Sequence, residues 1–202
     1  MGRIGVSVTK STSFRGVAQE FSNTYYYEFT GTPNQTLGDE LISLLVNFEK
    51  SIHAPSVTFV RAWAWSAGGT KAENNMLSQN SLSGAGTNGG SGGNDKERAF
   101  LVRFRAGTDS RGRPVYLRKW WHLDVSLLAG ASLPTGVIAQ TAQLSTAQRT
   151  QLETWGQSIK TLNPTSLGGG ACTLVSDKGR NITGATVAHP YYEHHQLGDM
   201  WR

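Results

Sequence analysis

The residues best suited to chemistry are six basic side chains within residues 103–119. They are Arg103, Arg105, Arg111, Arg113, Arg118 and Lys119. The only acidic residue in this segment is Asp109, so its charge surplus equals the +5 formal net charge of the whole chain. Aromatic residues are interleaved with these cations, and arginine with aromatic rings can bind phosphate and stack on bases. A solvated face or a contact with another subunit explains the same pattern, so both interpretations stay open.

A second candidate is segment 189–195, HPYYEHH. Histidine and glutamate can bind metal, but the adjacent His194 and His195 would point in opposite directions on a strand, and known histidine motifs use other spacings. We therefore expect no metal and no cofactor. We interpret residues 189–202 as a C-terminal arm that docks on a neighbouring subunit. The aromatic residues expected at subunit interfaces are Tyr25, Tyr26, Tyr27, Tyr191, Tyr192 and Trp201.

Catalytic signals are weak. The glycine-rich stretch that ends at Gly93 lacks the Gly-Lys-Ser/Thr ending of a phosphate-binding loop. The single cysteine, Cys172, has no sequence pattern that ties it to a histidine, and it cannot form an intrachain disulfide. We expect a small buried thiol there and a protein that is not an enzyme. A hydrolase that uses the 189–195 region is the competing hypothesis.

Hydrophobic periodicity predicts the elements that must position these residues. Strands are expected at 3–9, 21–30, 56–65, 99–106 and 115–123, and a terminal hairpin at 171–176 and 181–188. The strands at 99–106 and 115–123 flank a polar turn and should form a hairpin that carries the basic residues. The segment 126–142 is interpreted as a loop.

Two amphipathic helices are expected. One should cover 37–53, with Thr36 as its N-cap and Pro55 just beyond its end. The other should cover 146–162, after a capping box that begins at Ser145. Both apolar stripes need a partner, most simply one face of a sheet. In the strand at 56–65, Phe59 is expected to share a face with Arg61, Trp63 and Trp65, between neighbouring strands.

These elements predict an α+β fold, with a mainly antiparallel sheet, two amphipathic helices packed on one face, and extended loops and termini. A length of 202 residues suits a single domain, residues 1–202. Residues 66–98, rich in Gly, Ser and Asn, are then a loop excursion, with a short helix around 73–82. No apolar run approaches the ~20 residues of a membrane span. Charged residues make up only 16% of the chain, which suits a surface partly covered by neighbours.

Three stretches together resemble uncharacterised proteins of tailed bacteriophages, including cyanophages. They are residues 14–23 (FRGVAQEFSN) with the tyrosines that follow, residues 109–120 (DSRGRPVYLRKW) and residues 189–197 (HPYYEHHQL). The resemblance spans most of the chain and implies a phage origin. Because proteins of this kind and size are often virion components, it suggests a structural role. It supplies no catalytic residues.

The leading hypothesis is therefore a structural subunit of a phage virion, either capsid-associated (a cement protein) or part of the tail or neck. It would be made in the host cytoplasm, would end in the virion, and would contact copies of itself and other virion proteins, with no membrane. The alternative is a phage nucleic-acid-binding protein that uses the basic 103–119 hairpin.

Overall fold

Two antiparallel sheets and two helices form the described part of the chain. The computed structural model describes residues 1–14, 17–67, 75–89, 97–124, 146–177 and 191–193. The elements are β1 (Gly2–Phe14), β2 (Val17–Phe29), α1 (Gln35–Ile52), β3 (Thr58–Ser66), β4 (Met76–Ser81), β5 (Glu97–Thr108), β6 (Pro114–Asp124), α2 (Thr146–Lys160), the 3-10 helix η4 (Thr165–Leu167), β7 (Cys172–Val175) and β8 (Tyr191–Glu193). The predicted α+β class is confirmed. The predicted loop at 126–142, the capping residue Ser145 and the predicted strand at 181–188 lie outside the described residues.

The larger sheet has the strand order β4-β3-β1-β2-β7, with β1 in the middle. β1 and β2 pair without a break from Gly2↔Phe29 to Phe14↔Val17. The predicted strands at 3–9 and 21–30 are therefore confirmed, and both continue through residues whose structure the sequence left open. Their period-two alternation buries Ile4, Val6 and Val8 on one face of the sheet.

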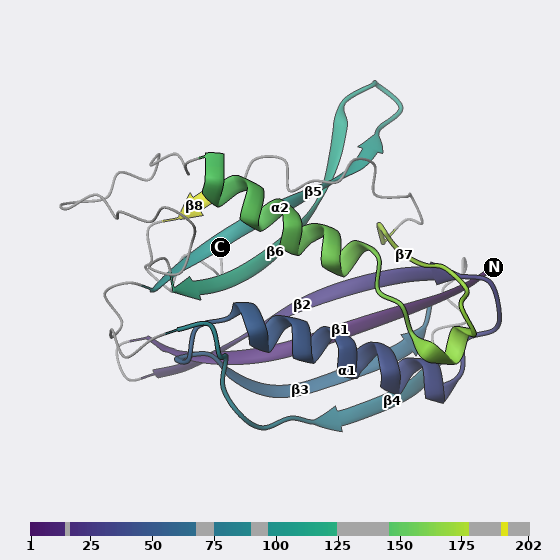
Figure 1. Cartoon of the computed structure of the whole chain (residues 1–202), viewed down its shortest axis with the longest axis horizontal. Coiled ribbons are helices and arrows are strands. Elements are labelled where there is room, and N and C mark those ends of the chain that lie inside the picture. The colour runs from purple at the N-terminus through teal and green to yellow at the C-terminus, as the bar shows by residue number, and fades with distance from the viewer. Residues whose placement is uncertain (15–16, 68–74, 90–96, 125–145, 178–190, 194–202) are drawn as a thin grey trace.

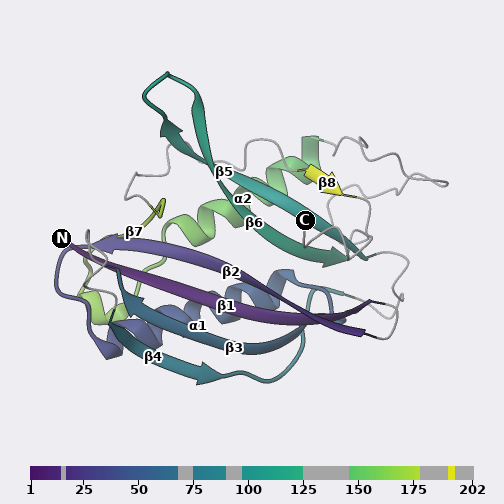
Figure 2. The ribbon, with the colours of Figure 1, turned by 180° about the vertical axis from the view of Figure 1, so that it is seen from behind.

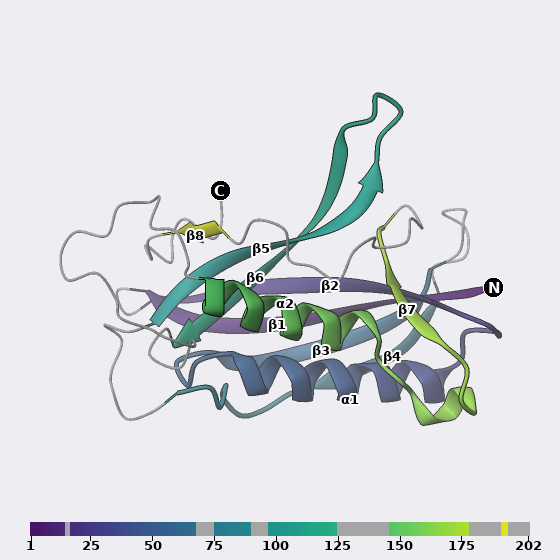
Figure 3. The same ribbon diagram turned by 45° about the horizontal axis from the view of Figure 1, so that its top comes forward.

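Both helices lie on the same side of the sheets, in front of them in Figure 1 and behind them in Figure 2. α1 packs across β1, β3 and β4, where its apolar stripe meets the inward-facing residues of the sheet. α2 runs beside α1 over the second sheet, as Figure 3 shows from a tilted view. The predicted helix at 146–162 and the placement of both helices on one face are confirmed.

The N-terminus of α1 differs from the prediction. The capping residue is Asn34, whose Oδ1 accepts a hydrogen bond from the backbone N–H of Leu37 at 2.9 Å. Thr36, the predicted N-cap, lies inside the helix. Both residue types cap well, and the sequence did not distinguish a start at Asn34 from one two residues later. The helix ends at Ile52, before Pro55, as expected.

A β-bulge changes the faces of β3. Pairing with β1 runs Thr9↔Arg61 and then Lys10↔Phe59, so one residue of β3 is skipped. The skip places Phe59 on the buried side of the sheet, away from Arg61. The prediction that these two residues share a face is therefore wrong, because a bulge interrupts strict alternation. The position of β3 between β1 and β4 is as expected.

The excursion at 66–98 contains β4, which pairs with β3. The predicted short helix around 73–82 is wrong. Residues 76–81, MLSQNS, have no strong helical stripe of their own, and tertiary pairing with the edge of β3 decides their structure. The predicted single domain stays a prediction, although one continuous core includes residues of both sheets and both helices.

The second sheet has the order β6-β5-β8 and contains the predicted hairpin of β5 and β6. β6 runs beside β2 in Figures 1 and 2, and β2 and β6 are in contact. Trp121 of β6 anchors this sheet to the helices, because its ring lies 6.2 Å from those of Phe48 and Trp155. Among the described residues, no helix is long and apolar enough to cross a membrane.

Candidate functional site

The β5–β6 hairpin separates the six predicted basic residues into three locations. Strand register pairs Arg103 with Arg118 and Arg105 with Tyr116. Residues directly opposite in an antiparallel pair share a face, so these three arginines lie on one face of the hairpin. Lys119 belongs to the other face, and Arg111 and Arg113 lie at the turn.

The outer basic face consists of Arg103, Arg105 and Arg118 with Tyr116 and Trp120. Arg105 and Arg118 are exposed, and the other three are half-buried. The guanidinium of Arg103 lies 5.7 Å from the centre of the Tyr116 ring. The residue directly across from Arg103 is a second arginine, Arg118. Like charges directly opposite each other destabilise a sheet unless neighbouring groups offset them.

Lys119 departs from the prediction of a surface contact. It is only 6% exposed, and its Nζ lies 5.0 Å from the centre of the Tyr25 ring. Burial lowers the pKa of Lys119 to about 8. Lys119 therefore belongs to the interior, and the prediction that places it with the surface arginines is corrected.

The tip of the hairpin, residues 107–113, is ordered by Asp109. Its Oδ1 accepts hydrogen bonds from the backbone N–H groups of Arg111 and Arg113, both at 2.9 Å, and its Oδ2 accepts one from Arg113 Nε at 2.9 Å. Gly107 and Gly112 adopt positive φ angles of 95° and 73°, which glycine tolerates best. A methyl group added at either glycine would meet no described atom within 4 Å. The tip is thus ordered by hydrogen bonds among its own residues, and no described atom lies close beside its two glycines.

The aromatic residues predicted for subunit interfaces have different locations. Tyr25 and Tyr27 are 0% exposed and belong to the core, so they offer no surface to a second subunit, which corrects that part of the prediction. Tyr26 is half-buried on the outer face of the larger sheet, with its ring 5.9 Å from that of Trp65. Tyr191 and Tyr192 lie in β8, which pairs with β5. Trp201 lies outside the described residues.

A buried polar cluster forms where α1 crosses β1 and β2, and we call it the Glu49 cluster. Its members are Lys10, Asn23, Tyr25 and Glu49. Glu49 Oε2 accepts a hydrogen bond from Lys10 Nζ, and Oε1 accepts bonds from the Tyr25 hydroxyl and from Asn23 Nδ2, the latter at 3.1 Å. Burial, with Glu49 nearby, raises the pKa of Tyr25 well above 10, so its hydroxyl stays a donor.

Asn23 joins this cluster to the second sheet. Its Nδ2 donates to the backbone carbonyl of Trp120 at 2.8 Å, and its Oδ1 accepts from the Trp120 N–H at 2.9 Å. The side-chain amide thereby occupies backbone groups at the edge of β6 that a neighbouring strand would otherwise pair with. The paired donor and acceptor of Trp120 also fix which end of the Asn23 amide is oxygen.

Two histidines extend the polar interior toward β6. His53 Nδ1 accepts the backbone N–H of His122 at 3.2 Å, and its Nε2 lies 3.8 Å from Glu49 Oε2. Burial, together with Lys10 and His122, lowers the pKa of His53 well below 6.5, so the ring is neutral. His122 Nε2 and Glu97 Oε2 are joined by a hydrogen bond of 2.9 Å.

Sequence reasoning missed the Glu49 cluster, although two signals were present. Lys10 continues the inward series of Ile4, Val6 and Val8 on β1, and Glu49 interrupts the buried stripe of α1. A charge at an inward position of two successive elements indicates a buried pair, because an unpaired buried charge is costly. The contribution of Asn23 depends on the tertiary contact with Trp120, which sequence spacing does not show.

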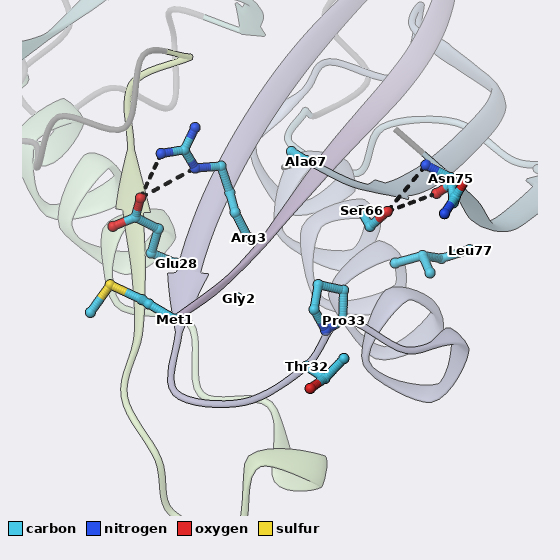
Figure 4. Close-up of a pocket in the computed structure, with 10 residues that line it drawn as sticks. All are labelled: Met1, Gly2, Arg3, Glu28, Thr32, Pro33, Ser66, Ala67, Asn75 and Leu77. Atoms are coloured by element: carbon cyan, nitrogen blue, oxygen red, sulfur yellow. Dashed lines mark hydrogen bonds and ion pairs between the residues drawn. The ribbon is translucent and has the colours of Figure 1, made fainter. Parts of the chain in front are cut away.

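A surface pocket of about 460 Å³ lies at the other end of β1. Figure 4 shows Arg3 directed toward Glu28 and Ser66 toward Asn75 within it. The Arg3 guanidinium donates to Glu28 at 2.7 and 3.2 Å, so this charge is already neutralised within the chain. The pocket therefore offers a ligand mainly shape and neutral polar groups.

The remaining candidates for chemistry are metal-binding side chains and the cysteine thiol, and the described ranges support neither role. Within them no group of three or more His, Cys, Asp or Glu residues is placed to hold a metal ion. Cys172 is buried, as expected of a small apolar residue, and burial raises the pKa of its thiol to about 12. The thiol is thus a poor nucleophile at neutral pH. Comparison of the chain with protein-family models, curated proteins and solved structures found no match.

Proposed function

We propose that this protein is a structural subunit of a larger assembly, and that the β5–β6 hairpin is the arm by which it contacts a neighbouring subunit. The observation that carries the proposal is the tip at 107–113, which extends beyond the rest of the described chain (Figure 3) and is ordered by its own hydrogen bonds. The space beside Gly107 and Gly112 holds no described atom within 4 Å, so a partner can approach the tip there.

The order of the tip is what suits it to binding. An isolated hairpin is marginal in water, but here the base of the hairpin is anchored by Trp121, and Asp109 holds the turn. A segment that is ordered before binding loses less conformational entropy on association. The same contact repeated around a ring or along a lattice would build an assembly from identical copies.

The setting proposed for this assembly is a phage virion, as a capsid-associated or cement protein or as a tail or neck component. Support for that setting comes from the resemblance to proteins of tailed phages, and the arm supports only the assembly role. The partners would be copies of this chain and other virion proteins, and the role needs no catalysis. The protein would be made in the host cytoplasm and end in the virion.

The arm is tested by replacing residues 107–114 with a two-residue Asn-Gly turn, which suits a tight hairpin and keeps Arg105 opposite Tyr116. We expect the wild-type chain to form a discrete multi-subunit species in light scattering behind a sizing column, and the shortened chain to elute as a monomer. Unchanged circular dichroism and thermal unfolding would show that the shortened chain is folded. If the two chains form species with the same number of subunits, the tip is not the contact.

A second candidate function is nucleic-acid binding by the outer basic face. The specific observation in its favour is that Arg103, Arg105 and Arg118 share one face of the hairpin with Tyr116 and Trp120. Arginines can neutralise phosphates while aromatic rings stack on bases. This face is separate from the tip, so the two functions can be removed independently.

The second candidate predicts salt-dependent binding that requires exposed arginines on this face. The R105A/R118A variant should bind a single-stranded oligonucleotide more weakly than wild type, with a shallower decline of affinity with salt, because each phosphate contact contributes to that slope. R61A is the matched control, since Arg61 is a half-exposed arginine on the larger sheet. Equal loss of binding in R61A, or no binding by wild type, would exclude the candidate.

A further inference from the structure

We propose that Lys10 and Asn23 become joined by an intramolecular isopeptide bond, with Glu49 transferring the protons. This inference concerns a covalent modification of the interior and does not depend on the assembly role. It rests on three groups that meet in one closed site: an amine, a side-chain amide and a carboxylate that contacts both.

Strand register brings the amine and the amide together. Val8 pairs with Asn23 and Lys10 pairs with Phe21, so Lys10 and Asn23 lie diagonally on the same inward face of β1 and β2. Diagonal neighbours are roughly 7–8 Å apart, which a long side chain can span. The two residues meet at one carboxylate, with Lys10 Nζ on Glu49 Oε2 and Asn23 Nδ2 3.1 Å from Oε1.

The backbone of Trp120 supplies the group that the reaction needs at the carbonyl. Its N–H donates to Asn23 Oδ1 at 2.9 Å, where negative charge would develop when a nucleophile adds to Cγ. A fixed backbone donor at such an oxygen stabilises the tetrahedral state. The Trp120 carbonyl holds Nδ2 at 2.8 Å, so the leaving nitrogen stays beside Glu49.

Burial prepares the nucleophile. The side chains of Lys10 and Glu49 are 0% exposed, and Asn23 is 2% exposed. Desolvation lowers the pKa of the Lys10 ammonium, although the Glu49 charge opposes this effect. Glu49 Oε2 is in direct contact with Lys10 Nζ, so it is the base placed to take the ammonium proton. A neutral amine is the form that attacks a carbonyl.

The reaction balances without any other reagent. Glu49 takes a proton from the Lys10 ammonium, and the Nζ electron pair forms a bond to Asn23 Cγ. Glu49 returns a proton to Nδ2, the Cγ–Nδ2 bond breaks, and ammonia leaves. The new amide nitrogen gives its extra proton to Glu49, and Glu49 passes it to the departing ammonia, so the carboxylate ends as it began. One ammonium ion is released overall, and no oxidation or reduction occurs.

The intact mass of the purified wild-type chain is the first test, because it needs no variant. We expect the mass to be lower than that of the unmodified chain by one ammonia molecule. Tandem mass spectrometry of a protease digest should give a branched peptide that joins Lys10 to Asn23. An intact mass equal to the unmodified chain, or a lowered mass without the branched peptide, would overturn the proposal.

Three variants assign the roles. E49Q preserves the shape of the carboxylate but cannot transfer the protons, so its mass should be that of the unmodified chain. K10M should also stay unmodified, since loss of ammonia that persists there would indicate cyclisation of an asparagine and not a cross-link. K119M is the matched control: Lys119 is a second buried lysine beside Tyr25, and this variant should still form the bond. Formation of the bond in E49Q would refute the role of Glu49.

Discussion

Hydrogen bonds between individual side chains explain how an otherwise apolar core holds the buried Glu49 cluster. Glu49 is surrounded by three donors, from Lys10, Tyr25 and Asn23, so its buried charge is compensated. A buried ion pair of this kind adds little to the free energy of unfolding compared with an apolar pair. Removal of one partner is strongly destabilising, because it leaves the other charge buried without compensation. His53, packed against the same carboxylate, avoids that problem by remaining neutral.

The neutral state of His53 predicts a loss of stability in mild acid. Its folded pKa lies below 6.5, so below pH 6.5 the unfolded chain takes up a proton that the folded chain does not. The free energy of unfolding should therefore fall as pH decreases from 6.5 to 5, by up to about 1.4 kcal/mol per pH unit for one such group. Glu97, whose pKa is lowered from 4.5, contributes only at more acidic pH.

Urea unfolding at several pH values measures this effect. H53N removes the titrating ring but leaves an acceptor near the His122 N–H, so its stability should change less between pH 6.5 and pH 5 than that of wild type. An identical pH dependence in the two chains would mean that His53 is not the responsible group.

Secondary-structure elements show where sequence reasoning succeeds and where it fails. The long amphipathic and alternating segments were predictable because their burial pattern repeats over many residues, as in α1 and in the β5–β6 hairpin. β4 could not be predicted, because its six residues have only a weak alternation of apolar and polar side chains. They form a strand because they pair with β3. The bulge that moves Phe59 was also invisible, because it depends on the register between β1 and β3.

The start of α1 gives a prediction at this scale. N34A should lower the free energy of unfolding by about 1 kcal/mol, because it removes the side-chain acceptor for the Leu37 N–H. T36A, at the position that the sequence indicated, should have a much smaller effect, since Thr36 lies inside the helix and is exposed. Chemical denaturation of both variants decides between the two positions, and a larger loss in T36A would contradict the capping assignment.

At the scale of the whole molecule, sheets form one layer and helices the other (Figures 1 and 2), and the arm extends from the second sheet. The sequence indicated the basic hairpin but did not show which of its basic residues are buried and which are exposed. That depends on which face of β6 packs against the core. Lys119 turns inward to Tyr25, while Arg105 and Arg118 turn outward. The role of Asn23 in the Glu49 cluster could not be predicted either, because it depends on the tertiary contact between Asn23 and Trp120.

The most direct test of the assembly role is the solution mass of the purified wild-type protein, by light scattering behind a sizing column, at low and at high salt. We expect a discrete species of several subunits that is free of nucleic acid and keeps its mass at high salt, because the arm is ordered in advance and association does not require a bridging polyanion. A monomer at every protein concentration and both salt concentrations would contradict the assembly role.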